Sequence, residues 1–484
     1  MRATGPVLAL FLLLLSSLLL IDLHGCGGEC TFTLPSSDSP PMISPEHVQP
    51  SAVTVPPSRG KIQHVVVIVQ ENRTPDNLFH DPVLMAKGAD IASSGTNFLG
   101  QTVQLKPTSL ESDYDLSHAH WAFVLMYDGG KMDGAGRFPA SCSRGATNCP
   151  PPNPQLMYVQ ASDVAPYFQM AEQYTFGDHM FQTNQGPSFP AHQFIISGTS
   201  APTATSNLFA AENPTSTVAG CIAPAGARVP LIDPSGNEFC SMYPCFEHPT
   251  LSDELDAKGV SWRYYTPSAG SIWTGPDAIQ HICQPQTQNG QLRCAGTAWS
   301  NVIIPQTKVL SDIANGRLAA VSWVIPSGQA SDHPAVNNGT GPSWVASIVN
   351  AIGNGPYWSN TAIIITWDDW GGWYDHVPPP RVISDSTSWG SGYVYGFRVP
   401  LIVISPYAKA GYISHVTHDF GSILNFIESV FGLPSLGYAD ARADDLSDCF
   451  DFSRTPLRFE TIQAPLSADY FLNDRTPPTD PDDD

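Results

Sequence analysis

The stretch TAIIITWDDWGG, residues 361–372, runs an apolar segment directly into two aspartates and two glycines. Two similar apolar runs occur elsewhere, IQHVVVIVQ at 62–70 and VPLIVIS at 399–405. Short Val- and Ile-rich runs without alternation predict strands that are buried on both faces, as in a parallel sheet covered by helices. A helical pattern at 341–354 precedes the apolar run that begins at Thr361, and another at 420–432 follows the run at 399–405. We therefore expect an α/β fold with a central, mostly parallel sheet flanked by helices.

Polar residues follow two of the predicted strands. Glu71 and Asn72 come directly after the first, and Asp368 and Asp369 come after the run that begins at Thr361. Ligands of open parallel sheets bind at the carboxyl ends of the strands, so we expect these side chains to meet. Adjacent carboxylates repel each other, and a divalent cation offsets that repulsion. The alternative is that Glu71 caps a helix and the two aspartates are solvated loop acids.

The identity of such a cation stays open at this point. Carboxylate and amide oxygens suit Ca²⁺, Mg²⁺ or Mn²⁺, and Zn²⁺ or Fe also accept them if imidazole joins. Several histidines beside acidic residues are candidates for metal or phosphate contact, whereas we expect His192 to be structural. The candidates are His118, His120, His333, His376, His415 and His418.

Ser188 is the candidate nucleophile. It lies in GPSFP, a turn bounded by glycine and proline, just before a segment that looks regular again. A serine in such a place is otherwise a turn former or a helix cap. A serine hydroxyl needs a base or a metal to become reactive. The G-x-S-x-G pattern of α/β-hydrolases is not matched, because Pro190 takes the last position.

The N-terminal segment predicts export. Arg2 and the apolar run at 7–21 have the form of a signal peptide, and the run is shorter than the roughly 20 residues that span a membrane. We assign 1–25 to this signal and 26–60, rich in Pro and Ser, to a tether. LHGC resembles a lipoprotein cleavage site, so secretion and a membrane tether through Cys26 both stay open.

Charge and cysteine content limit the partners and the compartment. The net charge of −22 argues against nucleic acid as a partner, because like charges repel at long range. Cysteines in an exported chain indicate disulfides, and eight of the ten lie in the body of the chain, so full pairing is possible. We predict local pairs Cys142 with Cys149 and Cys283 with Cys294.

The body is expected at 61–472, followed by an acidic, Pro-rich tail at 473–484. Residues 201–332 are loop-rich and contain several of the cysteines, and we expect them to form an insertion or cap beside the sheet.

Six blocks of the chain, in order, resemble the bacterial phosphoesterase family, which holds bacterial phospholipases C, plant non-specific phospholipases C and a group of acid phosphatases. The resemblance covers residues 62–428. The blocks are HVVVIVQENRTPDNLF (64–79), GGKMDGAGRF (129–138), GPSFPAHQFIISGT (186–199), DHPAVNNGTGPSWVASIVNAI (332–352), WSNTAIIITWDDWGGWYDHVPPP (358–380) and YGFRVPLIVISPYAKAGYISH (395–415).

The resemblance implies an alkaline-phosphatase-like fold, a divalent metal ion and a hydroxyl nucleophile that takes the phosphoryl group before water releases it. The residues that match the family's metal contacts are Glu71, Asn72, Ser188, Asp368 and Asp369. Those that match catalytic or phosphate-facing residues, beside Ser188 and Asn72, are His118, Asp133, Asp332 and His333. Two departures are visible: Asp369 stands where the family usually has Glu, and the Pro-Asn-Arg element of the phospholipases is missing after Ser188.

These observations predict an exported, metal-dependent phosphoesterase that acts on phosphate mono- or diesters through a phosphoryl-Ser188 intermediate, similar to an acid phosphatase. The alternative substrate is a phospholipid headgroup ester, cleaved in the manner of a phospholipase C. Two alternatives from other classes are a non-catalytic surface binding protein on the same fold and a metal-free serine hydrolase.

Overall fold

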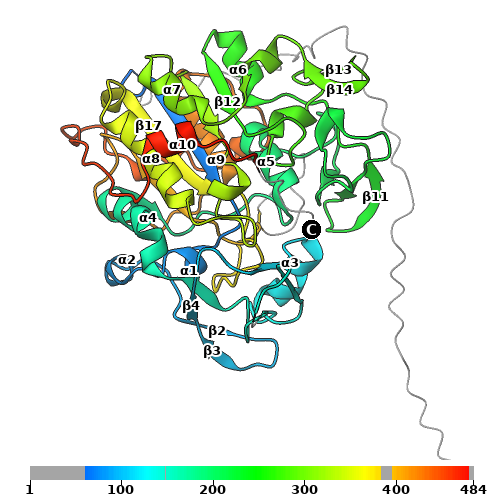
Figure 1. The fold of residues 1–484 in the computed structure, drawn as a ribbon, viewed down its shortest axis with the longest axis vertical. Coiled ribbons are helices and arrows are strands. Elements are labelled where there is room, and N and C mark those ends of the chain that lie inside the picture. The colour runs from blue at the N-terminus through cyan, green and yellow to red at the C-terminus, as the bar shows by residue number, and fades with distance from the viewer. Residues whose placement is uncertain (1–59, 148, 383–394, 479–484) are drawn as a thin grey trace, which may run out of the picture.

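The computed structural model describes residues 60–147, 149–382 and 395–478 (Figure 1). An eight-stranded sheet forms its centre. In spatial order the strands are β15 (Val302–Ile303), β12 (Trp262–Tyr265), β16 (Val321–Val324), β1 (His64–Gln70), β17 (Thr361–Trp367), β18 (Leu401–Ile404), β8 (Thr175–Gly177) and β19 (Tyr412–Ser414).

The three apolar runs form the strands β1, β17 and β18, as predicted. Every residue of β17 and β18 is buried, and β1 pairs in parallel with both β16 and β17. The strand β18 differs in direction, because it pairs antiparallel with β17 and with β8. An apolar run shows that a strand is buried on both faces, but it carries no information about direction. The prediction of a mostly parallel α/β sheet is confirmed.

Helices cover the sheet. The two predicted helices are α8 (Gly341–Gly353) and α9 (Phe420–Phe431). Helices α4 (Ala161–Gln173), α7 (Lys308–Ala314) and α10 (Ala468–Asn473) pack against α8, and α5 (Ser188–Ser197) packs against α9. In Figure 1, α8 and α10 lie over the face of the sheet that is turned toward the viewer.

Residues 201–332 do more than cover the sheet, since β12, β15 and β16 belong to this segment. The rest of it forms the upper right part of Figure 1, with α6 (Leu251–Lys258) and two small antiparallel sheets. These small sheets contain β9 (Phe209–Ala210), β10 (Val229–Ile232) and β11 (Glu238–Met242), and β13 (Gln284–Gln288) with β14 (Gln291–Ala295).

The lower part of Figure 1 is formed largely by residues 79–160. It contains α2 (Pro82–Ala86), α3 (His120–Tyr127) and short strand pairs. The pairs are β2 (Ser94–Thr96) with β3 (Thr102–Gln104), β4 (Lys106–Thr108) with β7 (Met157–Val159), and β5 (Tyr114–Leu116) with β6 (Ala140–Cys142).

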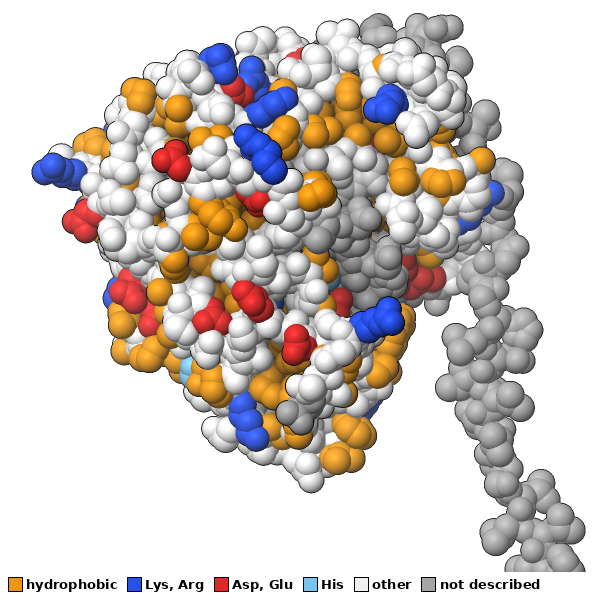
Figure 2. Space-filling model, viewed as in Figure 1, with side chains coloured by type: hydrophobic (Ala, Val, Ile, Leu, Met, Phe, Trp, Pro, Cys, Tyr) orange, Lys and Arg blue, Asp and Glu red, His pale blue; other side chains and the backbone are white. Residues whose placement is uncertain are grey.

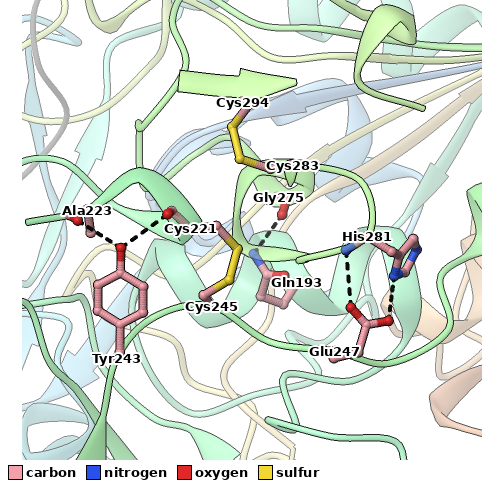
Figure 3. The surroundings of a disulfide bond; sticks show 10 residues. All are labelled: Gln193, Cys221, Ala223, Tyr243, Cys245, Glu247, Gly275, His281, Cys283 and Cys294. Atoms are coloured by element: carbon pink, nitrogen blue, oxygen red, sulfur yellow. Dashed lines mark hydrogen bonds and ion pairs between the residues drawn. A yellow bond between two sulfur atoms is a disulfide. The ribbon is translucent and has the colours of Figure 1, made fainter. Parts of the chain in front are cut away.

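Both predicted disulfides are present, Cys142–Cys149 and Cys283–Cys294. Figure 3 shows the second of them together with Cys221–Cys245. The cysteines of the body are not all paired, because Cys449 is a free, buried thiol. An even number of cysteines permits full pairing but does not require it.

The predicted signal peptide, Cys26, the tether up to residue 59 and the last six residues of the tail lie outside the described residues. Among the described helices, none has the length and apolar character needed to cross a membrane.

Candidate functional site

The ends of β1 and β17 meet at one edge of the sheet. Gln70 lies opposite Trp367 in the parallel register, so the residues that follow the two strands continue side by side. The backbone N–H of Asn72 donates to Asp368 Oδ1 at 3.1 Å, and that of Arg73 donates to the carbonyl of Asp369 at 3.0 Å. The structure therefore brings together Glu71, Asn72, Asp368 and Asp369.

A tight turn permits this approach. Asn72 has a φ of 63°, in the left-handed region that asparagine tolerates better than most residues. Gly371, with a φ of 60°, passes so close that a Cβ on it would lie 2.4 Å from the Asn72 carbonyl oxygen. A side chain at Gly371 would therefore push the two strand ends apart.

His192 joins the two acids that stand directly after the strands. Its Nε2 atom lies 3.4 Å from Glu71 Oε1 and 3.8 Å from Asp368 Oδ2, and all three side chains are fully buried. Their ligand atoms all lie within 4.8 Å of one another. We expected His192 to be structural. Its spacing of four residues from Ser188 was the available signal, because one helical turn places both residues on the same face.

Ser188 is the first residue of α5 and is fully buried. Its hydroxyl donates to Asp369 Oδ2 at 3.2 Å. The N-terminus of a helix also favours negative charge, because its backbone N–H groups point outward from the first turn. Ser188 therefore lies beside a carboxylate at a place suited to an anion.

His118 lies on the other side of Asn72. Its Nδ1 atom lies 3.0 Å from the Leu116 carbonyl and must be the donor there, which leaves Nε2 to accept from the Asn72 amide at 3.2 Å. The same Nε2 atom is 3.9 Å from Asp369 Oδ2. The ring of His333 lies 6.0 Å from that of His118, between centroids. Both predicted histidines therefore stand near the strand-end acids.

Two predicted residues do not join this group through a direct contact. The carboxyl group of Asp332 accepts from the Tyr167 hydroxyl at 2.8 Å and from the Trp367 indole at 3.0 Å, and burial raises its pKa to about 7. Asp133 is half-buried, and its Oδ1 atom has no hydrogen-bond partner within the part of the chain that the structure describes.

The other histidines are held in ion pairs of their own. His120 pairs with Glu238, His415 with Asp178 and His418 with Asp444. His376 lies in a second group of potential ligands with Asp76 and Asp375. In that group the Arg398 guanidinium already supplies positive charge, because it contacts Asp375 at 2.7 Å and Asp76 at 3.3 Å. The second group is therefore a compensated ion-pair network.

Within the described residues, no lysine or arginine forms an ion pair with Glu71, Asp368 or Asp369. Burial, and then the charges of Asp368 and Asp369, raise the pKa of Glu71 well above its usual value. Burial followed by the charge of Asp368 does the same for Asp369, and burial lowers the pKa of His192 to about 4. Burial thus disfavours both the ionisation of the two carboxyl groups and the protonation of the imidazole. A bound cation would favour the ionised carboxylates.

The unpaired atoms of this group fit a bound metal ion. Five buried atoms lack a hydrogen-bond partner among the described residues: Glu71 Oε1 and Oε2, Asn72 Oδ1, Asp368 Oδ2 and His192 Nε2. Buried polar atoms without partners are rare, because each costs about 1–3 kcal/mol. Four oxygens and one imidazole nitrogen at one place form a suitable donor set for a divalent cation.

Comparisons with known proteins agree with this geometry. The Phosphoesterase family matches residues 62–434. Phospholipase C A of Mycobacterium tuberculosis is 26% identical over 436 residues, which cover 82% of this chain and 78% of that protein. Hemolytic phospholipase C of Pseudomonas aeruginosa is 24% identical over 448 residues, which cover 81% of this chain and 56% of that protein.

A solved structure of a protein in the alkaline phosphatase superfamily from Vibrio parahaemolyticus also matches. It is 11% identical, with a TM-score of 0.34, and the match covers 79% of this chain and 71% of that one. The match to the family and the similarity to the phospholipases, rather than this structural neighbour, establish the relationship.

Proposed function

Because this chain belongs to the phosphoesterase family and is a hydrolase of phosphoric ester bonds, we propose that it transfers the phosphoryl group to Ser188 and then to water. The observation that carries the proposal is the contact of 3.2 Å between Ser188 Oγ and Asp369 Oδ2. A buried serine whose hydroxyl donates to a carboxylate oxygen has a proton acceptor within hydrogen-bond reach.

The proposed steps balance as follows. Ser188 Oγ forms a bond to phosphorus, its proton passes to Asp369 Oδ2, and the bond between phosphorus and the ester oxygen breaks. His118 and His333 are the candidate donors of the proton that the leaving oxygen takes up, and the donor must then carry a proton on both ring nitrogens; in His118, Nε2 gives up the hydrogen bond from the Asn72 amide. Water then attacks the phosphoserine and gives a proton to that histidine, and the Ser188 oxygen leaves and recovers its proton from Asp369.

We assign a divalent metal ion to Glu71, Asn72 and Asp368, with Asp369 and Ser188 as further ligands. When bound, it supplies positive charge for the phosphate oxygens and lowers the pKa of the serine hydroxyl. The net charge of −22 makes such a local source of positive charge necessary for an anionic substrate.

We propose a phosphate mono- or diester as the substrate, similar to that of an acid phosphatase. A second candidate, a phospholipid headgroup ester, is favoured by the names of the relatives and by exposed apolar side chains near the site. Trp121 and Val124 of α3 are 48% and 51% exposed, and Phe239 of β11 is 47% exposed. The contact between His120 of α3 and Glu238 of β11 brings these two elements together. The exposed apolar side chains therefore lie on both sides of this contact, and His120 is two residues from His118 in the sequence.

The tryptophans that follow β17 do not form an exposed apolar surface. Trp370 and Trp373 are fully buried and pack in a second apolar cluster with Phe123 and Phe138. Figure 2 shows one face of the molecule, on which apolar side chains lie on both the lower part and the upper right part. An interfacial surface, if the substrate is a lipid, therefore belongs to α3 and β11.

We also propose that the chain acts outside the cytoplasm, as secreted or lipid-anchored protein. The three disulfides support this, since disulfides persist in oxidising compartments.

The test is a substrate panel of aryl phosphate, aryl phosphodiester and phosphatidylcholine vesicles, with and without chelator. Ser188→Ala should abolish turnover of every substrate that the wild type cleaves. Ser197→Ala is the matched control, because Ser197 is also buried in α5 but donates to the Gln193 carbonyl, and it should retain turnover. Turnover that persists in Ser188→Ala would refute the nucleophile. Absence of wild-type turnover with every divalent metal would favour the binding protein.

A further inference from the structure

We infer that Tyr264 fixes His192 with its Nε2 lone pair directed at Glu71 and Asp368, which makes His192 a metal ligand. With this ligand the site should select a cation that accepts imidazole, such as Mn²⁺, Fe²⁺ or Zn²⁺, over Ca²⁺ or Mg²⁺. This inference rests on the metal-dependent function proposed above and names the class of its cofactor.

The hydrogen bonds of Tyr264 define the tautomer of the His192 imidazole. The Tyr264 hydroxyl donates its single proton to the Trp273 carbonyl at 2.9 Å. Its oxygen accepts from the Gly275 N–H at 3.3 Å and lies 3.5 Å from His192 Nδ1. Because the hydroxyl proton is already used, the contact with His192 is favourable only if Nδ1 carries the imidazole proton.

The other nitrogen of the ring then has only a lone pair to offer. His192 Nε2 lies 3.4 Å from Glu71 Oε1 and 3.8 Å from Asp368 Oδ2. The second oxygen of Asp368 is already occupied, since it accepts from the N–H groups of Asn72 and Asp369. When Glu71 is ionised, as a metal ligand must be, three fully buried acceptors face one another, and a shared cation turns this repulsion into attraction.

The separations fit ligands around one centre. Zinc ligands lie at about 2.0–2.2 Å, so two ligands at tetrahedral angles are roughly 3.4 Å apart. The distance of 3.4 Å between His192 Nε2 and Glu71 Oε1 therefore agrees with two ligands of one metal.

The segment at 201–332 holds this geometry both from the sheet, where Tyr264 stands in β12, and from the loops beside it. Gln193, next to His192 on α5, donates to the Gly275 carbonyl at 3.2 Å (Figure 3). Gly275 is so close to α5 that a Cβ on it would lie 2.8 Å from the His192 carbonyl oxygen. The disulfides Cys221–Cys245 and Cys283–Cys294 lie around this contact in Figure 3. The cysteine-rich segment thus supports the imidazole that faces the metal.

Two chemical consequences follow. Imidazole is a ligand that Mn²⁺, Fe²⁺ and Zn²⁺ accept, whereas Ca²⁺ and Mg²⁺ bind oxygen atoms. A group that hydrogen-bonds the far nitrogen of a ligating histidine orients the ring, and its removal usually lowers metal affinity by about 10- to 100-fold. Tyr264 is such a positioning residue.

The first test measures binding of Mn²⁺ and of Ca²⁺ to metal-free protein by calorimetry. His192→Gln should lower the affinity for Mn²⁺ by at least about 10-fold and change that for Ca²⁺ much less, and Tyr264→Phe should lower Mn²⁺ affinity by about 10- to 100-fold. The matched controls are His248→Gln, a buried histidine whose Nδ1 contacts the Pro249 carbonyl, and Tyr265→Phe, whose hydroxyl bonds Asp312. Equal loss of both metals in His192→Gln, or equal loss in a control, would overturn the inference.

The second test detects the imidazole directly. In Mn²⁺-loaded wild-type protein, electron-spin-echo spectra should show modulation from a coordinated imidazole nitrogen. The modulation should vanish in His192→Gln, shift in frequency in Tyr264→Phe and persist in His248→Gln. Its absence from the wild type, or its persistence in His192→Gln, would overturn the inference.

The Ser188→Ala variant separates this inference from the proposed function. Nitrogen modulation together with retained turnover in Ser188→Ala would refute the nucleophile and support the metal site. Turnover that depends on Ser188 without nitrogen modulation would support the function and refute His192 as a ligand.

Discussion

Glu71→Gln should stabilise the metal-free protein near neutral pH and at the same time weaken its binding of metal. Glu71 is fully buried beside Asp368, and burial first, then the charges of Asp368 and Asp369, raise its pKa well above 4.5. A raised folded-state pKa gives stability that is complete below the unfolded value of 4.5 and is lost as the pH rises through the folded value. Glutamine has nearly the same shape and does not titrate.

The size of the effect follows from proton linkage. Each pH unit between the unfolded and folded pKa of Glu71 removes about 1.4 kcal/mol from the free energy of unfolding. Metal-free wild type should therefore lose stability relative to Glu71→Gln as the pH rises from 5 to 7. Metal at 100 times its Kd should return about 2.7 kcal/mol to the wild type and clearly less to the variant.

Urea unfolding, followed by tryptophan fluorescence at pH 5, 6 and 7, measures both effects with and without Mn²⁺. Asp277→Asn is the matched control, because Asp277 is a fully buried acid whose pKa burial raises, but it lies outside the metal group. It should flatten the pH dependence without reducing the gain from metal. Parallel pH curves for wild type and Glu71→Gln, or equal gains from metal, would refute the reasoning.

Three further changes probe other parts of the molecule. Arg398→Met leaves the buried Asp375 without its arginine partner and should cost about 3–5 kcal/mol in urea unfolding; a loss below about 1 kcal/mol would contradict this. His281 is partly desolvated, but hydrogen bonds to neighbouring acids raise its pKa to about 10, so wild type should lose stability as the pH rises from 6.5 through 10. His281→Gln should lack that loss, and an unchanged pH profile of unfolding would argue against the ion pairs. Asp369→Glu pushes a longer carboxylate toward Ser188 and should lower kcat by roughly 100-fold with little change in KM, whereas an unchanged kcat would show that the 3.2 Å contact is dispensable.

The sequence predicted those features of the fold that depend on local pattern. The strands β1, β17 and β18 were visible because each is an unbroken apolar run, and the strand-end acids were visible because they interrupt such runs. The strands β12, β15 and β16 were not visible, since Arg263 and Ser322 interrupt the first and the last, β15 has only two residues, and all three stand in a segment rich in loops. The strand β18 is as short as β12 and β16, but it lies within a longer apolar run, so the continuity of the run was the limit.

The site was predicted less completely than the fold. Glu71, Asn72, Asp368 and Asp369 were found because topology places strand ends together. His192 was missed because its role depends on where α5 begins. Once the helix starts at Ser188, a residue four positions later must share its face, but the sequence alone leaves that start undefined.

The placement of Arg73 bears on the proposed metal dependence of the site, because this arginine does not supply its positive charge to the strand-end acids. Arg73 follows Asn72 directly and is fully buried, so it is a cation of the chain close to the strand-end acids. Its guanidinium donates to the carbonyls of Asp332 and Leu110 and to the Asn77 side chain, and it stacks on Trp373. These contacts use its donors to hold loops around the sheet edge. A phosphate at Ser188 must therefore find its positive charge in the group formed around Glu71 and Asp368, where the buried acceptors have no partner among the described residues.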